Sequence, residues 1–256
     1  FPPPFLPLAG SGLAFETTCV VDGSSHTLRE NTFDLCTVPP VRREGQTIWT
    51  LGDSHAGHLQ GLLLSLHQRT GVGVHLIEAP GVPFPMLPGQ LFDPRQRIYE
   101  RVAANLRPGD IVLLGRLYLD RDGDGLMDDL PQWAGELVRI SAQLSARGVN
   151  VVVMGPPPMF HFNSLLACWA VESTWCDVDR VTAERRVDQV RQILRAATRQ
   201  STNIFLFDTF SAVCPPGTPA CSPFRNRRAL FRDKDHFNSL GAQALTGAFL
   251  SFLKAN

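Results

Sequence analysis

Residues 47–58 have the sequence TIWTLGDSHAGH, in which an apolar run passes through Gly52 into a polar segment. Residues 47–51 are typical of a strand buried on both faces, and helical periodicity begins soon after them. This order predicts that Ser54 lies where a strand turns into a helix. The first N–H groups of a helix have no carbonyl partner within it, so they can stabilise negative charge that develops nearby. The segment therefore indicates an α/β fold and a candidate nucleophile at one of its turns.

Four further apolar runs follow, at residues 74–78, 111–114, 151–154 and 204–207. Stretches with helical periodicity lie at 55–68, 94–106, 131–147, 178–199 and 239–253. Strands that alternate with helices predict a three-layer α/β/α fold of the flavodoxin-like kind, with a roughly five-stranded parallel sheet. Functional sites in such sheets form beyond the carboxyl ends of the strands. Ser54 directly follows the first strand and is predicted at that edge.

The overall composition excludes several classes of protein. The chain has 256 residues, and its 24 Lys and Arg balance its 24 Asp and Glu, so the formal net charge is zero. Phosphate binding needs a basic surface, so nucleic acid is not an expected main partner. No apolar run approaches the roughly 20 residues that span a bilayer. Residues 1–45 are rich in Pro, Gly, Ser and Thr and are predicted to be a linker or N-terminal extension, followed by one domain over 46–256.

Six cysteines fall into three local pairs, namely Cys19 and Cys36, Cys168 and Cys176, and Cys214 and Cys221. None has the C-x-x-C spacing of a zinc or redox motif. We predict three short-range disulfides that pin loops, and hence an oxidising compartment. The alternative is six buried free thiols in a cytosolic protein. Six cysteines allow about 15 pairings, and only proximity along the chain favours this one.

A second polar cluster, RDKDHFN at 232–238, lies just before the last predicted helix. It follows the fifth strand, so it is predicted at the same sheet edge as Ser54. Asp233 precedes His236 by three residues, which lets one turn place the carboxylate beside the imidazole. We predict Ser54 as nucleophile, His236 as general acid and base, and Asp233 as the group that orients the imidazole. Asp235 stays open as an alternative orienting acid.

Gly-Asp-Ser-His at 52–55, paired with Asp233-x-x-His236, resembles the SGNH/GDSL hydrolase superfamily. The longer patterns Gly-Asp-Ser-His-Ala-Gly-His-Leu and Asp-x-Asp-His-x-x-x-x-Gly-Ala are similar to the periplasmic SGNH domains fused to membrane acyltransferase-3 proteins, which O-acetylate bacterial surface glycans. The resemblance covers roughly residues 46–253 and makes 46–256 the SGNH catalytic domain. It implies the same three roles for Ser54, His236 and Asp233.

The superfamily also uses a glycine and an asparagine as oxyanion donors. Gly81, in Ala-Pro-Gly-Val-Pro after the second strand, matches the glycine. Leu117 stands where the asparagine is expected, and its side chain has no donor. The adjacent Arg116 is the candidate replacement, and a salt bridge at the rim of the sheet is the alternative role for it.

The resemblance implies that an acetyl group passes through a Ser54 acyl-enzyme to a hydroxyl of a cell-surface polysaccharide or lipopolysaccharide sugar. It implies a glycan acceptor and an N-terminal acyltransferase-3 membrane domain of the same polypeptide that supplies the acyl group. The expected location is periplasmic or otherwise extracytoplasmic, tethered to the inner membrane in the full-length protein. Two alternatives remain: a secreted SGNH carbohydrate esterase or deacetylase that uses the same triad, and a glycan-binding module with a relic site.

No cofactor is expected for this chemistry, and no catalytic metal. One acidic run resembles a calcium loop, because Gly125 falls at position 6 and carboxylates fall at positions 1, 3, 5 and 9, which are Asp120, Asp122, Asp124 and Asp128. Position 12 is Pro131 in place of a bidentate Glu, so the alternative is a solvated turn-rich loop. His55 and His58 share a helical face and lack an evident third metal ligand, which favours packing roles or supporting roles beside the catalytic residues over a metal site.

Overall fold

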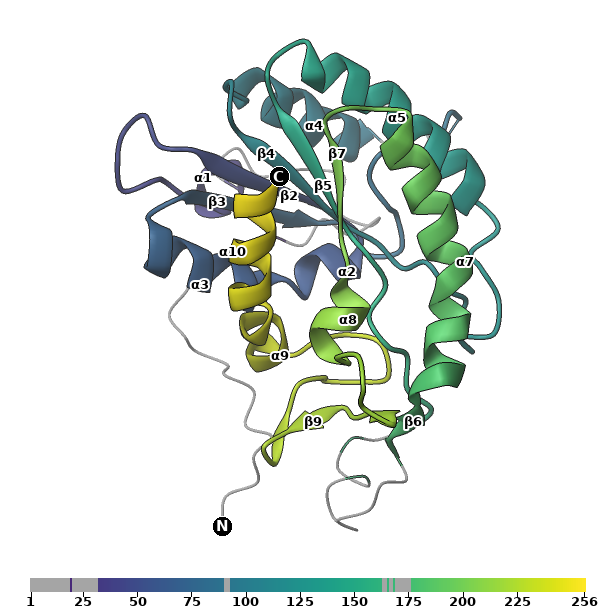
Figure 1. Ribbon diagram of the computed structural model, residues 1–256. Helices are drawn as coiled ribbons and strands as arrows, with labels where there is room; N and C mark the ends of the chain where they lie inside the picture. The colour runs from purple at the N-terminus through teal and green to yellow at the C-terminus, as the bar shows by residue number, and fades with distance from the viewer. Residues whose placement is uncertain (1–18, 20–31, 90–92, 163–164, 166–167, 169–175) are drawn as a thin grey trace.

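A six-stranded sheet forms the centre of the protein, as the computed structural model shows (Figure 1). The structure describes residues 19, 32–89, 93–162, 165, 168 and 176–256. In spatial order the strands are β1 (Thr37–Val38), β3 (Gly73–Glu78), β2 (Thr47–Gly52), β4 (Ile111–Gly115), β5 (Asn150–Met154) and β7 (Ile204–Phe207). All but β1 run parallel, which confirms the five predicted strands. β1 is an unpredicted sixth strand and pairs antiparallel with β3.

Helices cover both faces of this sheet, which confirms the three-layer α/β/α class. On one face α3 (Gln60–Thr70) packs against α9 (Ser239–Ala244) and α10 (Thr246–Ala255). On the other face lie α4 (Asp93–Asn105), α5 (Leu130–Ser145) and α7 (Arg180–Arg199) (Figure 1). Short helices complete the set: α1 (Thr32–Leu35), α2 (Ser54–Gly57) and α8 (Thr209–Val213). The parallel strands are apolar along almost their whole length because helices bury them from both sides.

Two predicted helices are each divided in the structure. The segment predicted as one helix over 55–68 forms α2 and α3, with a turn at His58 and Leu59 between them, and a Cβ at Gly57 would overlap the Glu78 carboxylate. The segment 239–253 forms α9 and α10, which meet at Leu245. Hydrophobic periodicity did not predict these bends, because the helices on both sides of each bend bury apolar residues against the same face of the sheet.

All three predicted disulfides are present. The Cys19–Cys36 bond anchors the chain just before β1, so the end of the predicted 1–45 extension is part of the sheet. The Cys214–Cys221 bond closes the loop after α8, where β8 (Ala220–Cys221) pairs with β6 (Val178–Asp179). A hairpin follows, made of β9 (Phe224–Arg225) and β10 (Arg228–Ala229), and it leads into the 232–238 loop.

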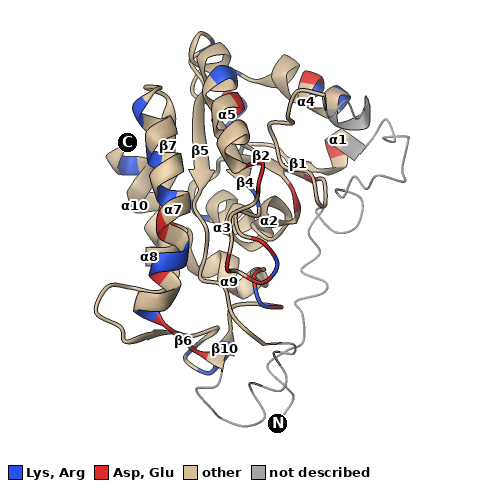
Figure 2. Cartoon of the chain, turned by 90° about the vertical axis from the view of Figure 1, so that its right-hand side faces the viewer, with Lys and Arg blue, Asp and Glu red and all other residues tan. Residues whose placement is uncertain are grey.

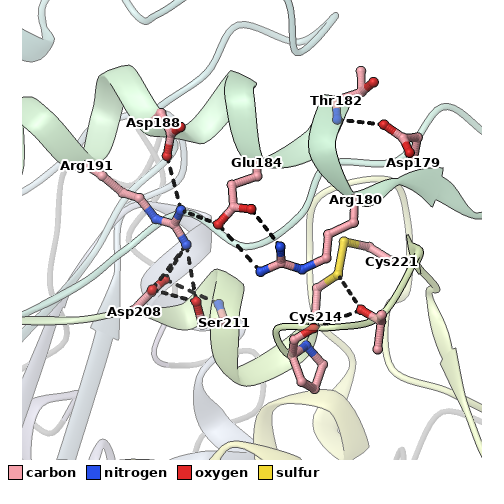
Figure 3. A network of polar contacts seen from close by, with 12 residues as sticks. Asp179, Arg180, Thr182, Glu184, Asp188, Arg191, Asp208, Ser211, Cys214 and Cys221 are labelled. Carbon is pink, nitrogen blue, oxygen red and sulfur yellow. Dashed lines mark hydrogen bonds and ion pairs between the residues drawn. A yellow bond between two sulfur atoms is a disulfide. The ribbon is translucent and has the colours of Figure 1, made fainter.

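Ionic contacts fasten α7 to the segment after β7 (Figure 3). The Arg191 guanidinium lies 2.9 Å from Asp208 and 3.2 Å from both Glu184 and Asp188. Figure 2 shows basic and acidic bands along α7, a helix of 20 residues. Among the ranges that the structure describes, no helix is both long enough and apolar enough to cross a membrane.

His75 is a buried polar residue beneath the end of the extension. Its ring lies 4.8 Å from the ring of Phe33 and 4.9 Å from that of Trp49, and neither ring nitrogen has a hydrogen-bond partner. Burial, with a smaller contribution from Arg101, lowers the pKa of His75 to about 3. The neutral ring therefore packs as an aromatic side chain would.

His75 should make the fold acid-sensitive. Below pH 6.5 the unfolded chain protonates this residue and the folded chain does not, until the pH approaches 3. Each pH unit in that window should remove about 1.4 kcal/mol from the free energy of unfolding. We expect His75→Phe to flatten the decline between pH 7 and pH 5, measured by urea unfolding of both proteins. Equal slopes for the two proteins would contradict the assignment.

Candidate active site

The turn between β2 and α2 depends on two glycines. Gly52 has φ +150°, and a Cβ there would lie 1.9 Å from the carbonyl oxygen of Gly115 at the end of β4. A Cβ on Gly115 would lie 2.5 Å from the carbonyl oxygen of His55. Both contacts are far inside van der Waals separation. The first turn of α2 can therefore rest directly on the end of β4 only because both positions are glycine.

Asp53 fixes this turn with both carboxylate oxygens. Oδ1 accepts the N–H of His55 at 2.8 Å, which caps α2. Oδ2 accepts the N–H of Leu117 at 2.8 Å, which ties α2 to the segment after β4. The Leu117 N–H is therefore already used, and neither its side chain nor its backbone offers a donor in place of the family's asparagine.

The three predicted catalytic residues meet at the carboxyl edge of the sheet. Ser54 Oγ lies 2.8 Å from His236 Nε2. On the opposite side of the ring, His236 Nδ1 lies 2.9 and 3.0 Å from the two carboxylate oxygens of Asp233. A nitrogen that faces a carboxylate carries the ring proton, so Nε2 is left to accept the Ser54 hydroxyl. This is the arrangement that a serine nucleophile and its base require.

Local hydrogen bonds hold the 232–238 loop in this shape. Asp233 Oδ1 accepts the backbone N–H of His236 at 2.7 Å and that of Asp235 at 3.1 Å. Arg232 donates its N–H to the carbonyl of His236 at 2.9 Å, and the carbonyl of Lys234 accepts the N–H of Phe160 at 2.9 Å. Asp233 therefore shapes the loop as well as orienting the imidazole.

The structure brings both candidate acids to His236. Asp233 makes the hydrogen bonds to Nδ1, as predicted, and its side chain is 46% exposed. Asp235 is buried, with Oδ1 3.1 Å from His236 Nδ1 and Oδ2 3.4 Å from His55 Nε2. Sequence reasoning left Asp235 open and gave His55 a packing role or a supporting role beside the catalytic residues. The available signal was the repeated Asp in DKDH together with a histidine directly after the nucleophile.

These charges change the acidity of the site. Burial lowers the pKa of His236, but Asp233 and Asp235 outweigh it through hydrogen bonds and charge and raise it to about 9. Burial, helped by His55 and His236, holds the pKa of His58 well below its usual value, so His58 stays neutral. Burial also raises the pKa of Glu78, at the end of β3.

The two predicted oxyanion residues have different surroundings. Gly81 has φ +73° and is exposed in the turn after β3, where Ala79 donates its N–H to the Gly52 carbonyl at 2.8 Å. Arg116 is buried, pairs with Asp129 at 2.7 Å, and lies 4.8 Å from the ring centre of Trp133. This places Arg116 in the ion pair that was its alternative role, away from solvent. An oxyanion role for Gly81 or Arg116 remains a prediction.

The site contains the kinds of atom that bind metals. Among the described residues, His55, Asp235 and His236 alone place three such atoms within 4.8 Å of one another. Asp235 contacts both imidazoles directly, and the absence of a catalytic metal stays a prediction. In the acidic loop, Asp120 accepts the N–H of Asp124, which also pairs with Arg186 at 3.2 Å. Calcium at Asp120, Asp122, Asp124 and Asp128 stays a prediction.

Comparison with known proteins identifies the family. The sequence profile described as "SGNH domain (fused to AT3 domains)" matches residues 18–251. The chain belongs to this SGNH family. The SGNH fold is that of hydrolases and acyltransferases, so the protein is an enzyme by fold. Comparison with curated protein sequences gave no match.

Solved structures show the same fold. The periplasmic domain of a lipopolysaccharide acetyltransferase from Salmonella ser. Paratyphi A has 14% identity and a TM-score of 0.67, over 95% of this chain and 94% of that one. Protein YXIM of Bacillus subtilis has 17% identity and a TM-score of 0.51, over 82% and 56%. An acetylxylan esterase from Geobacillus stearothermophilus has 16% identity and a TM-score of 0.47, over 82% and 94%. At these identities the first two likenesses concern the fold alone, and the third is too weak to support any argument.

Ser54 reactivity should increase towards alkaline pH. His236 accepts a proton only when its ring is neutral, and two carboxylates raise its pKa to about 9. Below that value the neutral fraction grows about tenfold per pH unit. We expect kcat/KM for a chromogenic acetyl ester, corrected with Ser54→Ala, to rise with a midpoint near 9. A midpoint at or below 6.5 would show that the carboxylates do not control His236.

Proposed function

We propose that this chain is an O-acetyltransferase domain that moves an acetyl group through a Ser54 acyl-enzyme to a hydroxyl of a bacterial cell-surface polysaccharide or lipopolysaccharide sugar. The observation that carries the proposal is the hydrogen-bonded series Ser54, His236 and Asp233. It occurs in a domain family described as fused to AT3 domains. The lipopolysaccharide acetyltransferase domain from Salmonella supports the choice of reaction and acceptor by likeness of fold.

In the first half of the reaction, neutral His236 takes the Ser54 proton on Nε2 while Ser54 Oγ attacks the acetyl carbonyl. The imidazolium that forms is stabilised by Asp233, which holds Nδ1 from the other side. The tetrahedral oxyanion would be bound by N–H groups at the start of α2 and at Gly81. Collapse breaks the bond to the donor's leaving group, which receives the proton from Nε2, and Ser54 is left as an acetyl ester.

In the second half, a sugar hydroxyl replaces the leaving group. His236 Nε2 removes the hydroxyl proton as the sugar oxygen attacks the acetyl ester, and it returns that proton to Ser54 Oγ as the ester breaks. The products are an O-acetylated sugar and the free serine. Water in place of the sugar would give acetate, which is the esterase reaction. The acceptor, not the triad, therefore decides between the two activities.

The acetyl group is proposed to come from an acyltransferase-3 membrane domain of the same polypeptide. The description of the family supports this partner. Three disulfides support an oxidising, extracytoplasmic location, and tethering to the inner membrane would follow from the membrane domain. In this arrangement the SGNH domain would receive acetyl groups at the membrane and pass them to a glycan in the periplasm.

The proposal is tested in cells that carry the complete protein. We expect Ser54→Ala to remove O-acetyl groups from the surface polysaccharide, measured by mass spectrometry, because the proposed acyl intermediate forms on Ser54 Oγ. The matched control is Ser251→Ala, an exposed serine on α10 that should leave acetylation unchanged. Unchanged acetylation in Ser54→Ala would contradict the proposal.

A second assay separates transfer from hydrolysis. The purified chain is given a chromogenic acetyl ester with and without candidate oligosaccharides. Acetylated sugar that depends on Ser54 supports the transferase, and the Ser54→Ala rate should fall at least about 1,000-fold. Free acetate alone, with every acceptor offered, would favour the esterase.

A further inference from the structure

Two contacts join the nucleophile helix to the loop that carries the base. His55, the residue after Ser54, points Nε2 at Asp235 Oδ2 across 3.4 Å, and its ring lies 4.6 Å from that of His236. One turn later, His58 Nδ1 accepts the N–H of Phe237 at 3.4 Å. Asp235 and Phe237 flank His236 in the chain. The contacts therefore hold the residues before and after His236 against α2.

Both contacts are hidden from solvent. His55 and Asp235 are each 4% exposed, and His58 is 8% exposed. His55 Nε2 and Asp235 Oδ2 are buried and neither has a hydrogen-bond partner in the described part of the chain, so the 3.4 Å ion-pair contact is the polar contact between them. A buried carboxylate is costly unless a donor or a positive charge faces it. Among the described residues, the Asp235 carboxylate has ion-pair contacts with His55 and His236, so it is best stabilised when at least one of these imidazoles carries a proton towards it.

We infer that His55 and Asp235 are positioning residues for the acyl-transfer reaction: they clamp α2 to the 232–238 loop and place a second carboxylate against His236. This inference rests on the proposed Ser54 chemistry and deepens it. Asp233 fixes the ring proton through its hydrogen bonds. Asp235 adds buried negative charge that stabilises the imidazolium, and His55 holds Asp235 where it can do so.

The clamp makes a distinct prediction about pH. The titratable and charged groups that face His236 are Asp233, Asp235 and Arg232 of its own loop, His55 and His58 of α2, and Glu78 at the end of β3. Of these, Asp235 is the most buried carboxylate in contact with the ring. Its removal should make His236 a weaker base without freeing the ring, because Asp233 still holds Nδ1. A residue needed only for packing would lower activity equally at every pH.

The test uses a fluorophosphonate probe, which reacts with the activated serine and needs no acceptor sugar. The second-order labelling rate is measured from pH 5 to pH 10 for the wild-type protein, Asp235→Asn, His55→Phe and the double variant. We expect Asp235→Asn to move the midpoint at least about one pH unit lower, as loss of one adjacent charge should. We expect the plateau rate to fall as well, since the base is weaker. Asp34→Asn, whose side chain is 76% exposed on α1, is the matched control and should not move the midpoint.

The double variant tests whether the two residues act together. If two substitutions act independently, the fold loss in rate of the double variant equals the product of the two single losses to within about twofold. We expect His55→Phe to cost at least about threefold less in the Asp235→Asn background than in the wild type, because the contact it removes is already lost. Near-UV circular dichroism reports folding. If Asp235→Asn does not fold, His55→Phe alone carries the test, since it keeps the ring but releases Asp235 and should also lower the midpoint.

The outcomes separate this inference from the proposed function. No labelling of the wild-type protein at any pH, or equal labelling of Ser54→Ala, would overturn the Ser54 chemistry itself. Labelling that depends on Ser54, with the same midpoint in wild type, Asp235→Asn and His55→Phe, would overturn the clamp alone. If the fold loss in labelling rate of the double variant equals the product of the losses in the two single variants, the joint action of His55 and Asp235 is overturned.

Discussion

The active site depends on how closely the ends of β2 and β4 approach the first turn of α2. Gly52 and Gly115 lie side by side in the β2–β4 register, and neither position has room for a Cβ. The sheet order places β3 on one side of β2 and β4 on the other, so this is where the chain changes direction across the sheet. Ligands of open α/β sheets bind at such switch points. Ser54 is the first residue of α2, the helix for which these two glycines leave room.

His236 is held near Ser54 by the packing of α3 against α9 on one face of the sheet. Gly61 of α3 lies against the backbone of Ser239, so α3 and α9 pack closely, and α3 continues from the nucleophile turn. Asn238 caps α9 and donates to the carbonyls of Ala229 and Phe231, which anchors the 232–238 loop at its end. The loop that carries His236 is thus held between α2 and α9. Ser54 and His236 are 182 positions apart in the chain and meet at 2.8 Å because Ser54 precedes α3, His236 precedes α9, and these two helices pack together.

The sequence predicted much of this arrangement, and its failures have physical causes. The five parallel strands could be located because each is a buried apolar run, and Ser54, Asp233 and His236 because chemistry restricts their residue types and spacing. β1 is two residues long, too short for any period, and depends on its disulfide and on pairing with β3. The bend between α2 and α3 lies next to Gly57, where a Cβ would overlap Glu78, a residue outside the helix. Neither β1 nor the bend can be predicted from the residues next to it in the sequence.

Side-chain orientation was also beyond local reasoning. Arg116 lies in the expected block, but Asp129 and Trp133, both later in the chain, turn its guanidinium into the protein. Asp235 and Asp233 are two residues apart, and spacing favoured Asp233 as the orienting acid. Asp235 also faces inward, towards His55, a residue that is far from it in the sequence. These choices are set by long-range contacts, which a single sequence does not reveal.

The most direct measurement is detection of the acyl group on the protein. The chain is mixed with an activated acetyl ester, quenched in acid within the first turnover, digested and mapped by mass spectrometry. Ser54 acylation through His236 predicts an acetyl ester on the peptide that contains Ser54, formed faster at alkaline pH and absent in Ser54→Ala and His236→Ala. Acetyl release by the wild-type protein with no adduct on Ser54, or an adduct that survives in His236→Ala at the wild-type rate, would contradict it.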